Sequence, residues 1–204
     1  MSHLLVIDIG SSQITAAVAE ITDDRRIVIR GLGRARSGGL KQGVVIQIDS
    51  VVDALVRSVA EANQMAGTKL TDPLVSVGGS HILGQDISGT VMLNHREVTD
   101  ILLTQAMEQV QAQAQVPERE ILSVIPQSFT LDSQTGIRLP QGMTGNRLDA
   151  HVHVITGATH VINNLKKCLK LAGLEVSVLV PSALAVSQLV LPDERELGVC
   201  VADI

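Results

Sequence analysis

The sequence is poor in aromatic residues: it has no tryptophan, no tyrosine and a single phenylalanine, Phe129. Proteins that bind single-stranded nucleic acid stack the bases on aromatic side chains, and such a platform is not available here. The net charge of −5 also lacks the basic excess that a surface for the phosphate backbone requires. We therefore expect no nucleic acid among the partners.

The sequence also has no run of about 20 apolar residues, the length that a helix needs to cross a bilayer. Its start passes from Met1 into an apolar segment without the basic residues of a secretory signal. Two cysteines, Cys168 and Cys200, lie far apart in sequence, which is typical of free thiols in a reducing compartment. These absences predict a soluble cytoplasmic protein.

The first third of the chain alternates between short apolar runs and turn residues, which predicts two hairpins and an antiparallel start to a mixed sheet. Ser50, with Asp53 three residues on, resembles a weak capping box that opens a helix, and Gly67 ends that helix. The helix is expected to bury one face that carries Val52, Leu55, Val56, Val59 and Ala66. The expected elements are strands at 3–9, 13–21 and 26–34, a glycine-rich loop at 37–43, a helix from Ser50 and a strand at 74–77.

The middle of the chain changes character, because it has a helix and several strands of its own. We interpret it as a small α+β subdomain inserted into the main domain. Without the insertion, the order strand-strand-strand-helix-strand-helix-strand-helix is that of a ribonuclease-H-like α/β domain. The insertion is expected to hold strands at 82–93, 121–126, 128–131 and 148–155 and a helix at 97–115. The main domain is then expected to resume with a helix at 161–172, a strand at 175–180, a helix at 182–190 and a strand at 197–204.

A candidate phosphate-binding hairpin follows the first strand, in the sequence Asp8-Ile9-Gly10-Ser11-Ser12. Gly10 would let the backbone approach a phosphate closely, and the two serines would add amide and hydroxyl donors. The Asp8 carboxylate would hold a hydrated Mg²⁺, an ion that needs few protein ligands. The pattern therefore predicts one side of a site for a nucleotide triphosphate.

The last four residues, Val201-Ala202-Asp203-Ile204, echo Val6-Ile7-Asp8-Ile9 at the first strand. Asp203 would then begin a second phosphate loop and hold the same Mg²⁺ through water. The echo indicates a protein with two similar lobes, of which this chain carries the first and the opening strand of the second.

Collinear stretches over essentially the whole chain carry a resemblance to a known family. They are 6–12, 37–44, 76–82, 125–132, 141–156 and 193–204. They are similar to the FtsA family of bacterial cell-division proteins, within the actin/Hsp70/hexokinase superfamily. The resemblance implies an actin-type ATPase lobe, subdomain 1A, at 1–82 and 157–197. It also implies an inserted SHS2-like subdomain 1C at 83–156 and the first strand of subdomain 2A at 198–204.

The resemblance further implies an ATP-binding adaptor that assembles with the FtsZ ring and anchors it to the cytoplasmic face of the inner membrane at the septum. Self-association and contacts with other division proteins would use subdomain 1C. The FtsZ contact in subdomain 2B and an amphipathic membrane helix would lie outside this chain. ATP and Mg²⁺ would be the cofactors, with Gly10, Ser11, Ser12 and Gln13 at the phosphates.

One residue departs from the family pattern, because Gln13 stands where lysine is common. Glutamine donates a hydrogen bond but brings no charge, so we expect weakened nucleotide binding. No enzymatic turnover and little ATP affinity are expected of this chain; submicromolar binding by calorimetry would contradict that. Two alternatives remain open: a PilM-like pilus-assembly protein that binds ATP and, less favoured, a sugar or acid kinase of the superfamily.

His151 and His153 alternate along an expected strand, so their imidazoles would share one face. A metal pair is conceivable, but no cysteine or acidic residue has the spacing to complete the ligand set. We interpret the two histidines as part of a polar strand face.

Overall fold

The computed structural model describes residues 2–176, 178–189 and 198–200. The chain divides into two compact units, of which unit 1 comprises Met1–Ile82 and His160–Ile204 and unit 2 comprises Leu83–Thr159. The expected strand at 197–204, with Asp203, lies outside the described residues except for 198–200, which form no regular element.

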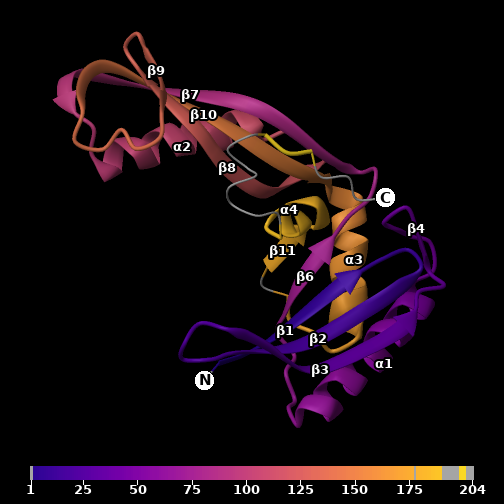
Figure 1. Ribbon diagram of the computed structural model, residues 1–204. Helices are drawn as coiled ribbons and strands as arrows, with labels where there is room; N and C mark the ends of the chain where they lie inside the picture. Colours follow the sequence, from indigo (N-terminus) through magenta and orange to yellow (C-terminus); the bar gives the residue numbers. More distant parts are fainter. Residues whose placement is uncertain (1, 177, 190–197, 201–204) are drawn as a thin grey trace. The chain divides into compact units, whose positions relative to one another are not determined.

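Unit 1 is built on a five-stranded sheet in the order β11-β6-β1-β2-β3 (Figure 1). β1 pairs antiparallel with β2 and β2 with β3, whereas β6 runs parallel to both β1 and β11. This mixed sheet is the expected ribonuclease-H-like arrangement of an α/β lobe. Its strands are β1 (Ser2–Ile9), β2 (Gln13–Ile21), β3 (Ile27–Arg36), β6 (Pro73–Val77) and β11 (Val178–Pro181), and β4 (Leu40–Lys41) and β5 (Val44–Val45) form a small separate ladder.

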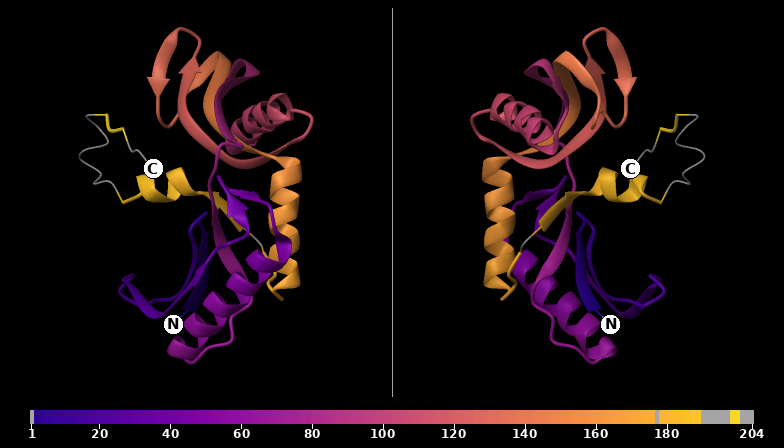
Figure 2. Two further views of the ribbon diagram at one scale, coloured as in Figure 1. Left: turned by 90° about the vertical axis from the view of Figure 1, so that its right-hand side faces the viewer. Right: turned by 90° about the vertical axis from the view of Figure 1, so that its left-hand side faces the viewer.

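One face of this sheet forms the core of unit 1. Leu5 and Ile7 on β1 are 1% and 0% exposed, and their partners on β2 are buried too. Figure 2 shows α1 (Ile48–Ala66) and α3 (Thr159–Leu171) on one side of the sheet and the short α4 (Ser182–Ser187) on the other. Alternation along each strand thus puts the bulky apolar residues beneath the two long helices.

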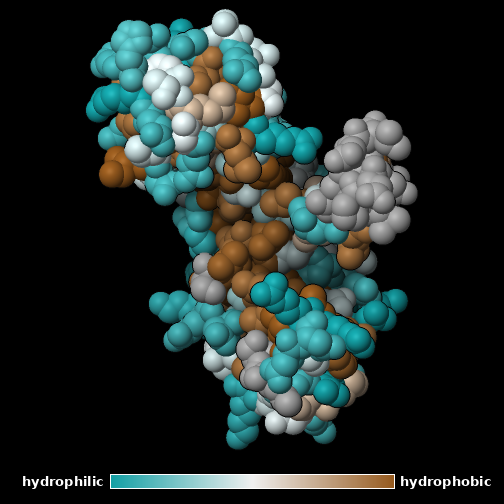
Figure 3. All heavy atoms as spheres, turned by 60° about the vertical axis from the view of Figure 1, so that its left-hand side comes forward, coloured by the Kyte–Doolittle hydropathy of each residue, from teal (hydrophilic) through white to brown (hydrophobic). Residues whose placement is uncertain are grey.

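The opposite face of the sheet keeps large apolar side chains at the surface. Ile27 and Ile29, on the edge strand β3, are 71% and 58% exposed. Figure 3 shows apolar side chains reaching the surface on the face that it draws.

The packing of α1 on β3 depends on backbone contact. A Cβ at Gly31 would lie 2.0 Å from the carbonyl oxygen of Ala62, and one at Gly33 would lie 2.0 Å from that of Ser58. The helix can approach so closely because the strand has no side chain at these two positions.

The structure corrects two expectations for α1. The helix begins at Ile48 after Gln47, without a side-chain cap, so the capping box of Ser50 and Asp53 is wrong. Val56 is 46% exposed and Ser58 is fully buried, although Val56 was expected on the buried face. The Ser58 hydroxyl is satisfied because it donates to the carbonyl oxygen of Leu55 at 3.1 Å. The expected end is confirmed: Gly67 has a left-handed φ of 66°.

Unit 2 is a four-stranded sheet in the order β7-β10-β8-β9, with α2 against one face (Figure 1). Its core includes Leu93 and Leu148, both fully buried, and Ala106 and Val110 from the helix. β9 was not expected, and the two expected strands at 121–126 and 128–131 are one strand. The elements are β7 (Ile82–Glu97), α2 (Asp100–Ala114), β8 (Arg119–Leu131), β9 (Gln134–Ile137) and β10 (Thr144–Ala158).

A hydrogen-bond network centred on Thr156 ties the two ends of unit 2 together, and Arg119 supports it. The Arg119 guanidinium donates to the hydroxyl and to the carbonyl oxygen of Thr156, at 2.8 Å and 3.0 Å. The Thr156 hydroxyl in turn donates to the carbonyl oxygen of Leu83 at 3.4 Å, where the chain enters the unit. Thr156 itself is only 3% exposed.

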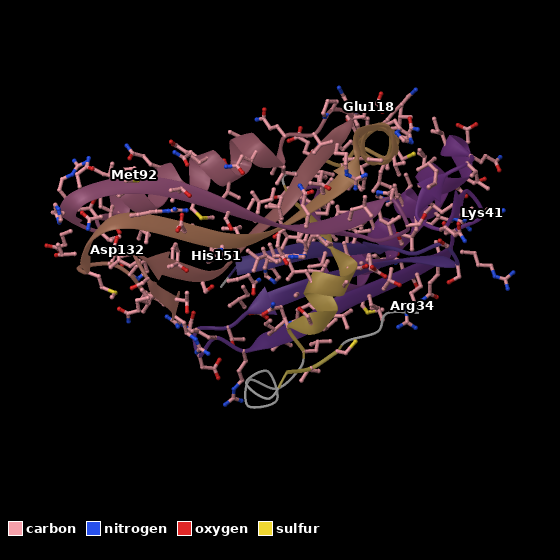
Figure 4. The ribbon with its side chains drawn as sticks, turned by 90° about the horizontal axis from the view of Figure 1, so that it is seen from above. Arg34, Lys41, Met92, Glu118, Asp132 and His151 are labelled. Atoms are coloured by element: carbon pink, nitrogen blue, oxygen red, sulfur yellow. The ribbon has the colours of Figure 1, made fainter. Side chains whose placement is uncertain are left out.

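The face of the unit 2 sheet away from α2 carries a network of polar side chains. His151, labelled in Figure 4, contacts two hydroxyl groups. Its Nδ1 lies 2.9 Å from the hydroxyl oxygen of Ser88, and its Nε2 lies 2.9 Å from the hydroxyl oxygen of Thr130. His153 Nδ1 lies 2.6 Å from the carboxylate of Asp86. The expectation of a shared polar face for the two histidines agrees with these contacts.

Asp149 belongs to the same face. Burial alone would raise the pKa of its carboxyl, but hydrogen bonds from Thr90 and Arg147, with the charges of Arg147 and His151, outweigh burial and lower the pKa. A carboxyl with a lowered folded pKa stabilises the folded state above its usual pKa of 3.8. That stabilisation is lost as the pH falls through the folded pKa.

We therefore predict that Asp149→Asn lowers the unfolding temperature of unit 2 at neutral pH. The difference from the unsubstituted protein should shrink as the pH falls below 3.8, because the native carboxylate becomes protonated there. Thermal unfolding followed by circular dichroism over a pH series measures the difference. A difference that is the same at every pH would contradict the assignment.

Candidate phosphate-binding site

The expected phosphate hairpin is a tight turn between β1 and β2. Ile9 pairs with Ile14, and the Gly10 N–H donates to the carbonyl oxygen of Gln13 at 3.1 Å. The turn therefore holds Ser11 and Ser12 at its tip, where they are exposed.

The loop after β3 is held against the hairpin by two hydrogen bonds. The Ser37 N–H donates to the carbonyl oxygen of Ser12 at 3.1 Å. The Gly43 N–H donates to the hydroxyl oxygen of Ser11 at 3.2 Å. The Ser11 hydroxyl hydrogen stays available, since the oxygen accepts in this contact.

The same loop also packs against the end of β6. A Cβ at Gly43 would lie 2.0 Å from the carbonyl oxygen of Gly78, and one at Gly79 would lie 2.4 Å from that of Gln42. Hairpin, loop, strand end and the start of α4 together surround an open depression of about 410 Å³. It is lined by Asp8, Ile9, Gly10, Ser11, Ser12, Gln42, Gly43, Gly78, Gly79 and Ser182.

The depression offers backbone donors and one carboxylate. Within the described part of the chain, the Ser11 and Ser12 amides donate to no protein acceptor, so both are available to a ligand. Asp8 is exposed at the end of β1 and could hold a hydrated cation. These residue types fit the phosphates and Mg²⁺ of a nucleotide.

Four of the expected site residues line the depression: Asp8, Gly10, Ser11 and Ser12. Gln13 is not among the lining residues. Asp203 lies outside the described residues. Sequence reasoning did not assign to the site the other polar and glycine residues that line the depression, which are Gln42, Gly43, Gly78, Gly79 and Ser182. The available signals were the glycine pair that ends β6 and the glycine-rich loop, both of which mark close backbone approach.

We predict that Gly43→Ala destabilises unit 1 by about 2 kcal/mol, since it adds both a clash and a strained backbone conformation. The φ of Gly43 is +79°, and the new Cβ would meet the Gly78 carbonyl oxygen. Gly67→Ala is the matched control, because Gly67 has a φ of +66° with nothing within 4 Å of its Cβ position. It should cost about 1 kcal/mol. Urea denaturation measures the free energy of unfolding of both variants. Equal losses in Gly43→Ala and Gly67→Ala would contradict the contact with Gly78.

A larger depression of about 550 Å³ lies in unit 2, lined by Gln115, Val116, Pro117, Arg119 and Ile121. In the described part of the chain, its lining includes no carboxylate and no glycine turn. It therefore lacks the features that suit the unit 1 depression to a phosphate.

Comparison with known proteins agrees with this architecture. The family described as "SHS2 domain inserted in FTSA" matches residues 79–156. Among solved structures, the PilM–PilN type IV pilus biogenesis complex is similar, with a TM-score of 0.59 over 87% of this chain and 47% of that chain. Its sequence identity is 15%, so this similarity concerns the fold alone. The fold and the insertion define an actin-like protein that carries an SHS2 domain.

The sequence relatives are more specific. The chain is 40% identical to the cell division protein FtsA of Neisseria meningitidis serogroup B, over 99% of this chain and 49% of that protein. It is 35% identical to FtsA of Escherichia coli strain K12, over 97% of this chain and 47% of that protein. The chain belongs to the FtsA family of cell-division proteins, and it spans about half the length of the curated relatives that it matches.

Among the described residues, no helix is long and apolar enough to span a membrane.

Proposed function

We propose that this chain supplies one half of the ATP cleft of an actin-like adaptor of cell division. The observation that carries the proposal is the depression at the β1–β2 hairpin, with the Ser11 and Ser12 amides and the Asp8 carboxylate at one site. Similarity to FtsA proteins over nearly the whole chain supports the cell-division role.

Each wall of the depression has a role in this proposal. Ser11 and Ser12 donate hydrogen bonds to phosphate oxygens, and Gly10 leaves room for them. Asp8 holds Mg²⁺ through its waters, and Asp203 does so from the second phosphate loop. Gln13 adds a neutral donor at the base of the hairpin. The second lobe closes the cleft, so binding by this chain alone is weak.

The remaining parts of the role follow the family. The complete protein assembles with the FtsZ ring and anchors it to the cytoplasmic face of the inner membrane at the septum. Unit 2 acts as subdomain 1C in self-association and in contacts with other division proteins. The protein turns over ATP weakly at most, and this chain does not.

An NMR titration of the chain with Mg·ATP tests the site. Weak binding in the millimolar range should shift the amide signals of Gly10, Ser11, Ser12, Gly43 and Gly79, while signals from unit 2 stay in place. An Asp8→Asn variant should lose the dependence of these shifts on Mg²⁺. Shifts confined to other residues, or none at all, would reject the proposed site.

The PilM-like alternative rests on the fold similarity to the PilM–PilN complex. The sequence favours FtsA, because identity with the FtsA relatives is 33–40% and identity with the PilM chain is 15%. Co-purification of the protein from cells distinguishes the two alternatives. Division proteins in the purified sample would support the FtsA role, and pilus proteins would support the PilM-like role.

A further inference from the structure

The proposed phosphate site is short of positive charge. Among the described residues, its lining includes one carboxylate, Asp8, and no lysine or arginine. A nucleotide diphosphate or triphosphate carries several negative charges, and charge-assisted hydrogen bonds are the stronger ones at such a group. Gln13, at the base of the hairpin, is neutral. A cation from a neighbouring element would therefore raise the affinity.

The strand register places one arginine next to that glutamine. Arg36, the last residue of β3, pairs with Gln13 on β2, and two residues further along Arg34 pairs with Thr15. Thr15 in turn pairs with Asp8 on β1. Paired residues share a face of the sheet, as do residues two apart on one strand. Arg36 therefore lies on the face of the sheet that carries Asp8.

The side chain of Arg36 is free to move to a ligand. It is exposed, and among the described residues it forms no ion pair and no side-chain hydrogen bond. Arg30 on the same strand differs, because its guanidinium is 2.5 Å from the Glu20 carboxylate. In Figure 4, Arg34 extends from the strand away from the ribbon.

The backbone at Arg36 is nevertheless fixed against the hairpin, since the next residue, Ser37, donates its N–H to the Ser12 carbonyl oxygen at 3.1 Å. Neighbouring strands lie about 4.8 Å apart, which an extended arginine side chain can span. A guanidinium also matches a phosphate in geometry, because it can donate two parallel hydrogen bonds.

We propose that Arg36 supplies the positive charge at the phosphate hairpin, on the strand adjacent to the neutral Gln13. Arg36 contacts the phosphate oxygens from the β3 side, opposite the glycines at the end of β6. This inference rests on the proposed nucleotide site and assigns its cationic residue.

The test uses NMR titrations of the chain and its variants with Mg·ADP and Mg·ATP. Arg36→Gln should lower the affinity about tenfold, the size of one charge-assisted hydrogen bond. Arg36→Lys should lose less, because it keeps the charge. Gln13→Lys should restore binding in the Arg36→Gln protein, since it returns the charge one strand away. The affinity of the unsubstituted chain should also fall more steeply with salt than that of Arg36→Gln.

Two variants serve as matched controls. Arg26→Gln makes the same change of net charge directly before the other end of β3, which begins at Ile27, and should leave the affinity unaltered. Arg34→Gln removes a charge from the same face two residues further from the hairpin, and it should reduce the affinity less than Arg36→Gln. Thermal unfolding of every variant shows whether the fold is intact.

The outcomes separate the two proposals. Hairpin shifts in the unsubstituted chain with equal affinity in Arg36→Gln would reject the role of Arg36 and leave the site standing. Equal losses in Arg26→Gln and Arg36→Gln would also reject it, because net charge alone would then explain the effect. No hairpin shifts in the unsubstituted chain would reject both the site and the role of Arg36.

Discussion

Gly33→Ala should destabilise unit 1 by at least about 3 kcal/mol, at the upper end of what overpacking a well-packed core costs. The added Cβ would lie 2.0 Å from the Ser58 carbonyl oxygen and 2.9 Å from the Ala62 backbone nitrogen. Both neighbours are backbone atoms, so no side-chain rotation relieves the contact. α1 would have to move away from β3, which exposes Ser58 and Ala62, both fully buried now.

Urea denaturation measures this loss, and Gly38→Ala is its control. Gly38 lies in the loop after β3, and nothing is within 4 Å of its Cβ position. Its replacement should change the stability by less than about 0.5 kcal/mol. If both substitutions were equally tolerated, the close packing of α1 on β3 would be wrong.

Leu148→Ala should destabilise unit 2 by about 3 kcal/mol, the typical cost of an emptied leucine site. Leu148 is fully buried and lies on β10, the strand between β7 and β8. Its side chain packs in the cluster with residues of α2. The loss combines the transfer of apolar atoms to water with the cavity that remains.

Amide hydrogen exchange shows which strands lose protection in the Leu148→Ala variant. Protection should fall across the strands of unit 2 and stay unchanged in β1 and β2 of unit 1, because the units have separate cores. Met92→Ala is the control, since Met92 is 57% exposed on β7 and should cost less than about 0.5 kcal/mol. A uniform loss of protection in both units would show that they unfold as one.

Local patterns predicted most elements of the fold, and the errors have physical causes. Val56 was expected in the core because it falls on the apolar face of the helix, but the approach of α1 to the glycines of β3 selects small residues for the contact. That contact buries Ser58 instead. A pairing between distant glycines and a helix face has no signature in the sequence of the helix itself.

β8 illustrates a second limit of sequence patterns. The sequence pattern predicted two strands, 121–126 and 128–131, with the break directly after Pro126, a residue that cannot donate to a sheet ladder. The strand instead continues through a register shift: Pro126 lies opposite Val152, Ser128 lies opposite His151, and Gln127 has no partner. A bulge accommodates proline without ending the strand.

Only the part of the candidate site that is contiguous in sequence was predictable. Asp8 and the hairpin residues follow one another in the chain, so a short motif identified them. Gly43, Gly79 and Ser182 come from three other segments. Their meeting depends on β1, β6 and β11 lying parallel and adjacent, which the sequence order alone does not fix.

The contacts of Arg119 with Thr156, and of Thr156 with Leu83, give unit 2 a closed neck. Because the two ends of unit 2 lie together, the folding of unit 1 has to close only the equivalent of a short loop at this point. The entropy cost of that closure does not depend on the size of unit 2. With such an attachment, the segment between β6 and α3 can be lengthened, shortened or exchanged at little entropic cost to the sheet of unit 1.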